Sequence, residues 1–321
     1  MPHLRLARQE SCGSLTGIGT VTGYLHPQYA GSLAEFGTPY ELPRCRGWIL
    51  KRRISGFPYH DGMGCYPLFA CRDWSGLHTD LEGLSPELVA LSLVTDPFGE
   101  YEPRCLRGCF DVLIPFKEHY VVDLALDMNS CVSSHHRRYA RKALREVHIE
   151  RCHSPAQFVD EWADLYTTLI ERHRIKGVPA FSRTSLAKQL TVPGIVMFRA
   201  THKEITIGAT LWYILGDVGY YHLGAYNDTA YQLRASFALF WFAIEYFVSN
   251  DLRWLNLGAG AGISQRDSDG LSRFKQGWSS GTRTAYFCGR VLNRERYLEI
   301  LNARAISETD YFPAYRRGEF G

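Results

Sequence analysis

The sequence predicts an α+β fold, in which helices flank twisted sheets of mostly antiparallel strands. The main observation is a run of three segments rich in β-branched and aromatic residues, at 194–200, 205–215 and 218–226. The turns between them, THKE and GD, are too short to hold a crossover helix, so neighbouring strands are expected to be antiparallel. Segments with helical periodicity lie on both sides of this run, which predicts helices packed against the sheet.

The other elements of the second half follow in chain order. Ser154 and Pro155 are typical of a helix start, and apolar residues then recur at helical spacing until residues 176–177. Residues 234–250 are apolar on most faces and predict a largely buried helix, and 252–258 predict a short inner strand. The order is completed by a polar loop at 264–270, a short helix near 269–278, a strand at 282–292 and a last helix from Asn293.

The first half of the chain gives a weaker signal. It contains many Gly, Pro and Cys residues, and strand-like segments occur at 48–50, 89–94 and 120–124. With 321 residues, of which 45% are hydrophobic and 13% aromatic, the chain is long enough for two domains with sizeable cores. We therefore predict mixed α and β structure in this half as well.

Charge is unevenly distributed along the chain. The net charge of +3 is too small to predict nucleic-acid binding by itself. However, residues 54–130 contain twelve Asp or Glu against four Lys or Arg, whereas 131–153 contain six Lys or Arg against two Glu. At about 100° per residue, five of these cations fall within an arc of roughly 140° on one helix face. They are Arg137, Arg138, Arg141, Lys142 and Arg145. Such a face is either solvated surface or a docking surface for a phosphate backbone.

We expect a cytoplasmic protein without a membrane span or a metal. The N-terminal stretch MPHLRLARQESCGSLTG lacks the apolar core of a secretory signal. The longest apolar run, 237–244, is well short of the roughly 18–20 residues that a bilayer helix requires. None of the nine cysteines has CxxC spacing, which predicts reduced, mostly packed thiols and no zinc site, although a catalytic Cys–His couple stays open.

The stretch LNLGAGAG at 255–262 looks at first like a nucleotide-binding loop. A dinucleotide site requires a parallel βαβ unit with a helix that starts at the glycines. Here a polar loop follows the glycines, and strands of antiparallel character precede them. We therefore interpret Gly258 and Gly260 as small residues that let backbone or substrate approach closely at a strand end, or as a tight turn without a ligand.

Four segments resemble the C-terminal domain of the FemABX-like transferases, within the GNAT acyltransferase superfamily: GATLWYILGDVGYYHLGAYN, ASFALFWFAIEYF, LNLGAGAG and DGLSRFKQGWS. In that family a strand ending in glycines leads through a loop to an FK dipeptide, here Phe274 and Lys275. The predicted order of helices and strands is also that of the GNAT fold. The match extends upstream through VVDLALD and the basic segment, so that it covers most of 110–300.

This resemblance implies two tandem GNAT-like domains, a probable acceptor side at 1–150 and a probable donor side at 151–321. It also implies acyl transfer to an amine. The best-known members move an aminoacyl group from charged tRNA to a peptidoglycan precursor, and related enzymes in natural-product pathways use other acceptors. The expected partners are therefore tRNA and a peptidic or small-molecule amine, with aminoacyl-tRNA as co-substrate and no other cofactor. The amino acid, the acceptor and the oligomeric state are not predicted.

The choice between the two possible donors depends on one turn, because GNAT enzymes that use acetyl-CoA hold its pyrophosphate on a glycine-rich turn before a helix. Here that junction is NDTAYQLRASFA and lacks both glycines, which counts against CoA. Arg234 and Ser236 are candidates to bind one phosphate at the helix start. They are equally consistent with a surface ion pair and a helix cap.

Lys275 is the first candidate for catalysis, because its ammonium would stabilise negative charge on the carbonyl or the departing oxygen. Phe274 beside it would stack on adenine or, more commonly, pack in the core. His222, on the strand GYYHLGAY, is a candidate base, with a hydrogen-bonded core histidine as the commoner outcome. Glu245, inside an apolar helix, is another. The assignment of the base stays open.

Three functions are therefore carried forward. The first is aminoacyl-tRNA-dependent transfer that forms an amide bond. The second is acyl-CoA-dependent N-acyl transfer on the same fold. The third is a non-catalytic RNA-binding scaffold built on a former transferase.

Overall fold

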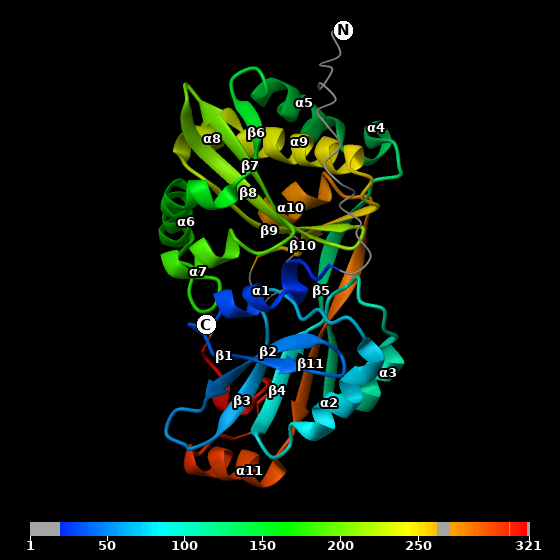
Figure 1. The fold of residues 1–321 in the computed structure, drawn as a ribbon, viewed down its shortest axis with the longest axis vertical. Coiled ribbons are helices and arrows are strands. Elements are labelled where there is room, and N and C mark those ends of the chain that lie inside the picture. The colour runs from blue at the N-terminus through cyan, green and yellow to red at the C-terminus, as the bar shows by residue number, and fades with distance from the viewer. Residues whose placement is uncertain (1–19, 262–269, 308, 320–321) are drawn as a thin grey trace.

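One eleven-stranded sheet runs through the whole molecule in the computed structural model, which describes residues 20–261, 270–307 and 309–319 (Figure 1). The order of strands is β1-β2-β3-β4-β11-β5-β10-β9-β8-β7-β6. The prediction of an α+β fold with mostly antiparallel strands is confirmed. The strands form a single continuous mixed sheet, however, where two sheets were expected.

The strands of the first half are longer and more numerous than the sequence suggested. Their bounds are Thr38–Leu42 (β1), Gly47–Arg53 (β2), His60–Gly64 (β3), Leu88–Val94 (β4) and Val112–Asp123 (β5). All neighbouring pairs here are antiparallel except β3 and β4, which are parallel. β4 is LVALSLV, and burial of nearly every residue explains why it lacks the alternation of a surface strand.

The strands of the second half, with the exception of β6, were predicted to within two residues. They are His148–Cys152 (β6), Ile195–His202 (β7), Ile205–Leu215 (β8), Val218–Tyr226 (β9), Trp254–Gly258 (β10) and Gly281–Val291 (β11). The hairpins β7–β8 and β8–β9 are antiparallel, as the short turns require. β6 was not foreseen, because its sequence HIERC is short and half polar.

The last strand crosses back into the first half of the sheet. β11 pairs antiparallel with both β4 and β5, which are separated by α3 in the chain (Figure 1). A segment near the C-terminal end therefore lies in the middle of the sheet. Local sequence pattern predicted the strand but not this position, because pairing partners are set by tertiary packing.

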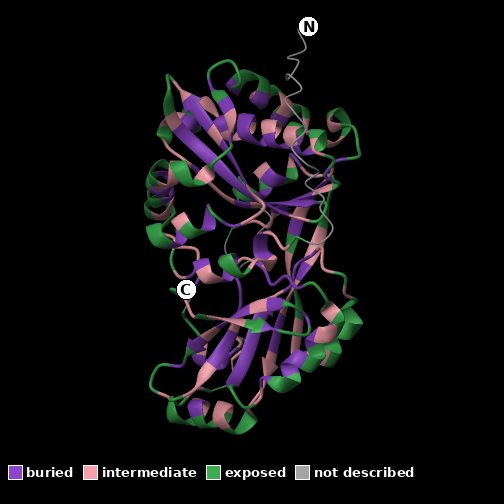
Figure 2. Ribbon diagram, viewed as in Figure 1, coloured by how far each residue is buried: buried purple, intermediate pink, exposed green. Residues whose placement is uncertain are grey.

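Helices cover both faces of the second half of the sheet (Figure 1). On one face α5 (Ser134–Ala143) and α9 (Ala235–Ser249) enclose an apolar core with Phe198, Trp212 and Phe240. α9 is apolar on most faces because it lies between the sheet and α5, as Figure 2 shows by its buried and intermediate residues. The short helices α8 (Asp228–Leu233) and α10 (Gly270–Gln276) lie before and after this helix in the chain.

On the other face the core joins the two halves of the chain. α6 (Val159–His173) and α7 (Arg183–Gln189) pack there together with α1 (Pro27–Ser32). Tyr24 and Tyr29 from the first half pack against Tyr213 of β8 in one cluster. The first predicted helix of the second half begins as a 3-10 turn at Pro155–Phe158 and continues as α6.

The remaining helices cover the first half of the sheet. α2 (Leu77–Gly83) and α3 (Pro103–Cys109) pack on β2 to β4, and α4 (Met128–Cys131) follows β5. α11 (Arg294–Ala303) begins as predicted after its cap, Asn293. Within the described residues, no helix is long and apolar enough to cross a membrane. The predicted loop at 264–270 lies largely outside the described residues, as does the N-terminal stretch at 1–17.

Candidate active site

The candidate site begins where β9 and β10 separate. Their parallel ladder joins Trp254–Asn256 to Val218–Tyr220 and then stops, although β9 continues to Tyr226. Gly258 ends β10 with a φ of +73°, a conformation that glycine adopts without strain. A Cβ at this position would lie 3.2 Å from the Nζ of Lys275. The glycine therefore permits the close approach of a charged side chain, whereas the sequence interpretation expected backbone or substrate there.

Lys275 lies at this strand end with only 5% of its surface exposed. Its ammonium donates a hydrogen bond to the carbonyl of Ala259 at 2.6 Å and lies 5.6 Å from the ring centre of Tyr221. α10 carries the lysine, and its Ser272 is buried as well. A cation held in so dry a place interacts strongly with any charge that develops nearby.

His119 of β5 and Asn256 of β10 lie next to the lysine. The side-chain oxygen of Asn256 accepts from the amide of Gly258 at 2.8 Å, which fixes its orientation. The same oxygen is 3.0 Å from Nδ1 of His119, so Nδ1 carries the proton and Nε2 does not. Burial, together with the charge of Lys275, lowers the pKa of His119 to about 4. This histidine is neutral at physiological pH, and sequence analysis did not single it out.

The FK dipeptide is tied to the basic helix through His136. Nε2 of His136 donates to the carbonyl of Phe274 at 2.9 Å, because a carbonyl only accepts, and Nδ1 then accepts from the hydroxyl of Ser133 at 2.8 Å. The ring of Phe274 packs edge-on against Phe240 at 4.9 Å between ring centres. Phe274 therefore has the packing role that was the commoner expectation, and α5 and α10 are held together.

The start of α9 faces α5. Arg234 is the cap residue of α9, in a left-handed conformation with a φ of 57°, and Ser236 lies in the first turn. The guanidinium of Arg234 stacks on the ring of Tyr139 at 3.9 Å, and that of Arg138 lies 5.3 Å from the same ring centre. The structure thus brings a predicted phosphate-binding residue and a predicted tRNA-binding residue onto one aromatic ring.

The basic face of α5 points largely to solvent. Arg138, Arg141, Lys142 and Arg145 are exposed, and Arg137 is half-buried, where it donates to the carbonyl of Asn129. On the opposite side Ala140, Ala143 and Val147 are buried, and Leu144 alone of the expected apolar face is exposed. The face was predicted from its spacing, but α5 itself ends at Ala143, so Arg145 lies just beyond it.

Part of the sequence, and the fold of most of the chain, are similar to known proteins. Residues 132–276 match the family model of an acetyltransferase (GNAT) domain, a range that begins before α5 and ends just after Lys275. The crystal structure of FemX superposes with a TM-score of 0.61 at 14% identity, covering 85% of this chain and 93% of that one.

The chain has the fold of FemX. The same fold occurs in the C-terminal domain of a putative lysylphosphatidylglycerol synthetase from Agrobacterium fabrum, with a TM-score of 0.61, 13% identity and coverage of 87% and 92%. L-PGS from Bacillus licheniformis follows at a TM-score of 0.55 and 14% identity, with coverage of 90% of this chain and all of that one. No curated protein matches the sequence significantly. The resemblance to FemABX-like proteins of the GNAT superfamily is confirmed at the level of the fold.

In this FemX-like fold His222 lies in a closed aromatic cluster. Its Nδ1 is 3.1 Å from the hydroxyl of Tyr24 and its Nε2 is 3.0 Å from the side-chain oxygen of Gln189. Burial lowers the pKa of His222 to about 3. The ring of His222 packs with Tyr213 on one face of the sheet. Tyr221, whose ring lies beside the ammonium of Lys275, packs with Trp212 and Phe240 on the other face of the sheet.

Glu245 is exposed on α9 and accepts from the indole nitrogen of Trp241 at 2.8 Å. Partial burial raises the pKa of this carboxyl. Glu245 thus has the surroundings of a residue on the surface of a helix.

Sequence analysis passed over Asp96, which follows β4 in the segment DPFG. Its carboxylate accepts from the hydroxyl of Tyr220 at 2.8 Å and from the amide of Phe98 at 3.0 Å. Burial raises the pKa of Asp96 to about 6 against these hydrogen bonds. The guanidinium of Arg283 stacks on Phe98 nearby, 4.1 Å from the ring centre. A buried carboxylate whose pKa lies near neutrality is typical of functional sites. The one signal for Asp96 in the sequence is an acidic residue shortly after a buried strand.

Five of the cysteines in the described residues are buried, among them Cys45, Cys65 and Cys288. Burial raises the pKa of the Cys65 thiol to about 12. Such thiols stay protonated and pack as small apolar groups. The described residues contain no group of three His, Cys, Asp or Glu side chains placed to hold a metal.

Proposed function

We propose that this protein transfers an aminoacyl group from aminoacyl-tRNA to an amine of a peptidic or small-molecule acceptor, forming an amide bond. The observation that carries this proposal is the buried ammonium of Lys275 at the point where β9 and β10 separate. One of the proteins with a similar fold is named as the C-terminal domain of a putative lysylphosphatidylglycerol synthetase, and another as L-PGS. The amino acid transferred and the acceptor are not specified by this proposal.

The reaction joins the amine nitrogen to the ester carbonyl carbon and breaks the bond from that carbon to the ribose oxygen. The amine loses one proton and the ribose oxygen gains one. Negative charge develops first on the carbonyl oxygen and then on the departing oxygen. Lys275 stabilises this charge, and stabilisation of an oxyanion by one preorganised group is commonly worth about 3 to 4 kcal/mol.

The tRNA side of the proposal rests on the cations around Tyr139. Arg138 and Arg234 share its ring, and Arg141, Lys142 and Arg145 extend the positive surface along α5. His136 connects this helix to α10, so a phosphate backbone bound on α5 would be held in fixed relation to Lys275. Neither the binding of tRNA on α5 nor the stabilisation of charge by Lys275 requires a glycine-rich pyrophosphate loop.

Acyl-CoA-dependent N-acyl transfer is the second candidate. One observation favours it, the match of residues 132–276 to an acetyltransferase domain. In that case Arg234 and the first turn of α9 would hold a phosphate of the cofactor. The same ammonium would then stabilise the thioester oxyanion.

The test is intact-mass analysis of products formed from a pool of charged tRNAs and candidate amines, with and without RNase, and in parallel with acetyl-CoA. The proposal expects a mass increase of one amino-acid residue that disappears with RNase. A product formed only from acyl-CoA, and insensitive to RNase, would instead establish the second candidate. Binding of RNA without transfer from any donor would leave the scaffold function.

Replacement of the charge at Lys275 tests its role. Lys275→Ala is expected to lower turnover at least ten-fold, because one charged hydrogen-bond donor to the oxyanion is lost. Lys275→Arg keeps the charge and should retain more turnover than the alanine variant. Lys188→Ala, on the exposed end of α7, serves as the control. Circular dichroism checks the fold of each variant, and normal turnover of folded Lys275→Ala would remove this residue from the mechanism.

A further inference from the structure

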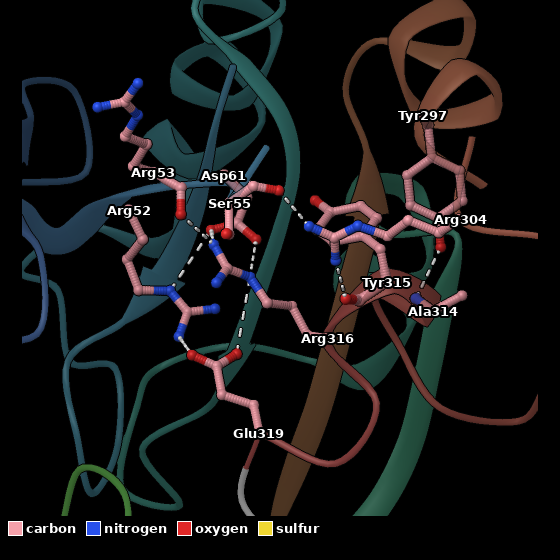
Figure 3. Close-up of polar contacts among 10 residues, drawn as sticks. All are labelled: Arg52, Arg53, Ser55, Asp61, Tyr297, Arg304, Ala314, Tyr315, Arg316 and Glu319. Atoms are coloured by element: carbon pink, nitrogen blue, oxygen red, sulfur yellow. Dashed lines mark hydrogen bonds and ion pairs between the residues drawn. The ribbon is translucent and has the colours of Figure 1, made fainter. Parts of the chain in front are cut away.

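A polar cavity of about 350 Å³ lies on the first half of the molecule, away from Lys275. Its wall comes from the segment after α1, from β2 and from the C-terminal segment. Four permanent cations line it, Lys51, Arg52, Arg53 and Arg316, together with two carboxylates, Glu35 and Glu319. Figure 3 shows Arg52, Arg316 and Glu319 converging from distant parts of the chain, whereas the side chain of Arg53 points away from them.

Asp61 fixes the C-terminal segment beside this cavity. Arg316 donates to both oxygens of Asp61, at 2.8 and 3.0 Å, across 255 positions of sequence. Asp61 is only 1% exposed, so this two-point contact is shielded from water. Arg304 also donates to the carbonyl of Tyr315 at 2.8 Å, and the hydroxyl of Tyr297 accepts from the amide of Ala314 at 3.0 Å. The segment is therefore anchored without any help from Glu319.

Glu319 bridges the two guanidinium groups (Figure 3). One carboxylate oxygen lies 2.8 Å from a terminal nitrogen of Arg52, and the other lies 3.6 Å from Nε of Arg316. Glu319 is 32% exposed, whereas Arg52 is 7% exposed. Nε of Arg52 is buried and has no hydrogen-bond partner among the described residues, and its ion-pair distance to Asp61 is 3.4 Å. The guanidinium of Arg52 thus has more donors than Asp61 and Glu319 accept.

We infer that this cavity is a binding site for an oxyanion, and that Glu319 is a tethered competitor occupying the place of the ligand. A carboxylate that spans two arginines has the shape and charge that a phosphate or a ligand carboxylate would present to them. When Glu319 turns away, Arg52 and Arg316 share the single buried carboxylate of Asp61, and the cavity gains one net positive charge. Lys51 and Arg53 also line the cavity. Lys51 is paired with Glu87 at 2.8 Å, and the side chain of Arg53 points away from Glu319, so Arg52 and Arg316 provide the charge that a ligand meets.

This site does not depend on the acyl donor or on Lys275, and it is tested by binding alone. The probe is inorganic pyrophosphate, titrated into the full-length protein at low salt and followed by isothermal titration calorimetry. Glu319→Gln keeps the size of the side chain and removes its charge. We expect this variant to bind pyrophosphate at least ten-fold more tightly than the unmodified protein, because the internal competitor is lost.

Two further variants separate this effect from general charge and from folding. Glu82→Gln, which removes an exposed carboxylate on α2, should leave the affinity unchanged. Arg52→Lys combined with Glu319→Gln should lose the ten-fold gain, because lysine cannot replace the planar guanidinium. A parallel titration with succinate distinguishes the two ligand classes: a gain for pyrophosphate alone assigns a phosphate, and an equal gain for succinate assigns any dianion, including a carboxylate.

The inference is overturned if Glu319→Gln binds neither probe more tightly than the unmodified protein while its melting temperature shows that it is folded. A gain of the same size in Glu82→Gln would also overturn it, because it would come from net charge rather than from the cavity.

Discussion

The two arginine-rich regions of the molecule use their charge in different ways. In the cavity on the first half, Arg52 and Arg316 are largely buried and bonded to Asp61 and Glu319. No ion pair among the described residues involves the five basic residues on and just after α5, which are Arg137, Arg138, Arg141, Lys142 and Arg145. The guanidinium of Arg138 instead lies over the ring of Tyr139. Paired arginines hold a fixed geometry and suit a small ligand, whereas exposed cations create a field that suits a polyanion. Net charge alone would not have distinguished these two regions.

The largest expected effect is on the stability of the protein and concerns the buried arginines of the cavity. Asp61→Asn should lower the free energy of unfolding by about 3 to 5 kcal/mol, because it leaves two buried guanidinium groups without their fixed acceptor. Asp160→Asn, which removes an exposed partner of Arg183, should change stability little. Urea denaturation followed by circular dichroism measures both. Equal effects would mean that the ion pairs of Asp61 contribute no more to stability than an exposed ion pair.

The next effect concerns RNA binding by the exposed side. Reversal of Arg138, Arg141 and Arg145 to Glu should weaken the affinity for aminoacyl-tRNA by roughly 100-fold and flatten its dependence on salt, since fewer counterions are released. The control reverses Arg104, Arg107 and Arg294, which are also exposed, and so makes the same change in net charge. Fluorescence anisotropy at several salt concentrations measures both variants. Unchanged affinity in the first variant would exclude α5 as the tRNA surface.

The smallest effect concerns the ring that Arg138 and Arg234 share. Tyr139→Leu should weaken tRNA binding by about three-fold, because cation–π contacts at exposed sites contribute about 0.5 to 1 kcal/mol. Tyr139→Phe keeps the aromatic face and should bind like the unmodified protein. If both variants behave alike, the ring does not position these arginines for RNA.

The elements of the second half were predictable because their signals are local. The β-branched and aromatic residues of β7 to β9, the short turns between these strands and the apolar run of α9 are all signals that span only a few residues. The same is true of the basic face of α5 and of Gly258 as a small residue at the end of a strand, but the approach of Lys275 to this strand end was not predicted. The catalytic and binding roles assigned to these residues stay predictions.

What the sequence did not reveal depends on distant pairs. Arg52 and Glu319 are 267 positions apart, and His119 is 137 positions from Asn256. No periodicity relates such residues, because the strand order of the sheet brings them together. Asp96 was missed for the same reason: it accepts a hydrogen bond from Tyr220 of β9, which belongs to the other half of the chain.

The central place of β11 bears on how the protein is made. Until residues 281–291 have left the ribosome, β4 and β5 each present an open edge where β11 will later insert. The nascent chain therefore has two unpaired strand edges until β11 is synthesised, and the sheet becomes continuous only when β11 pairs with both strands. A chain that ends before residue 281 would keep both edges open and is therefore expected to aggregate, because open strand edges pair readily with other chains.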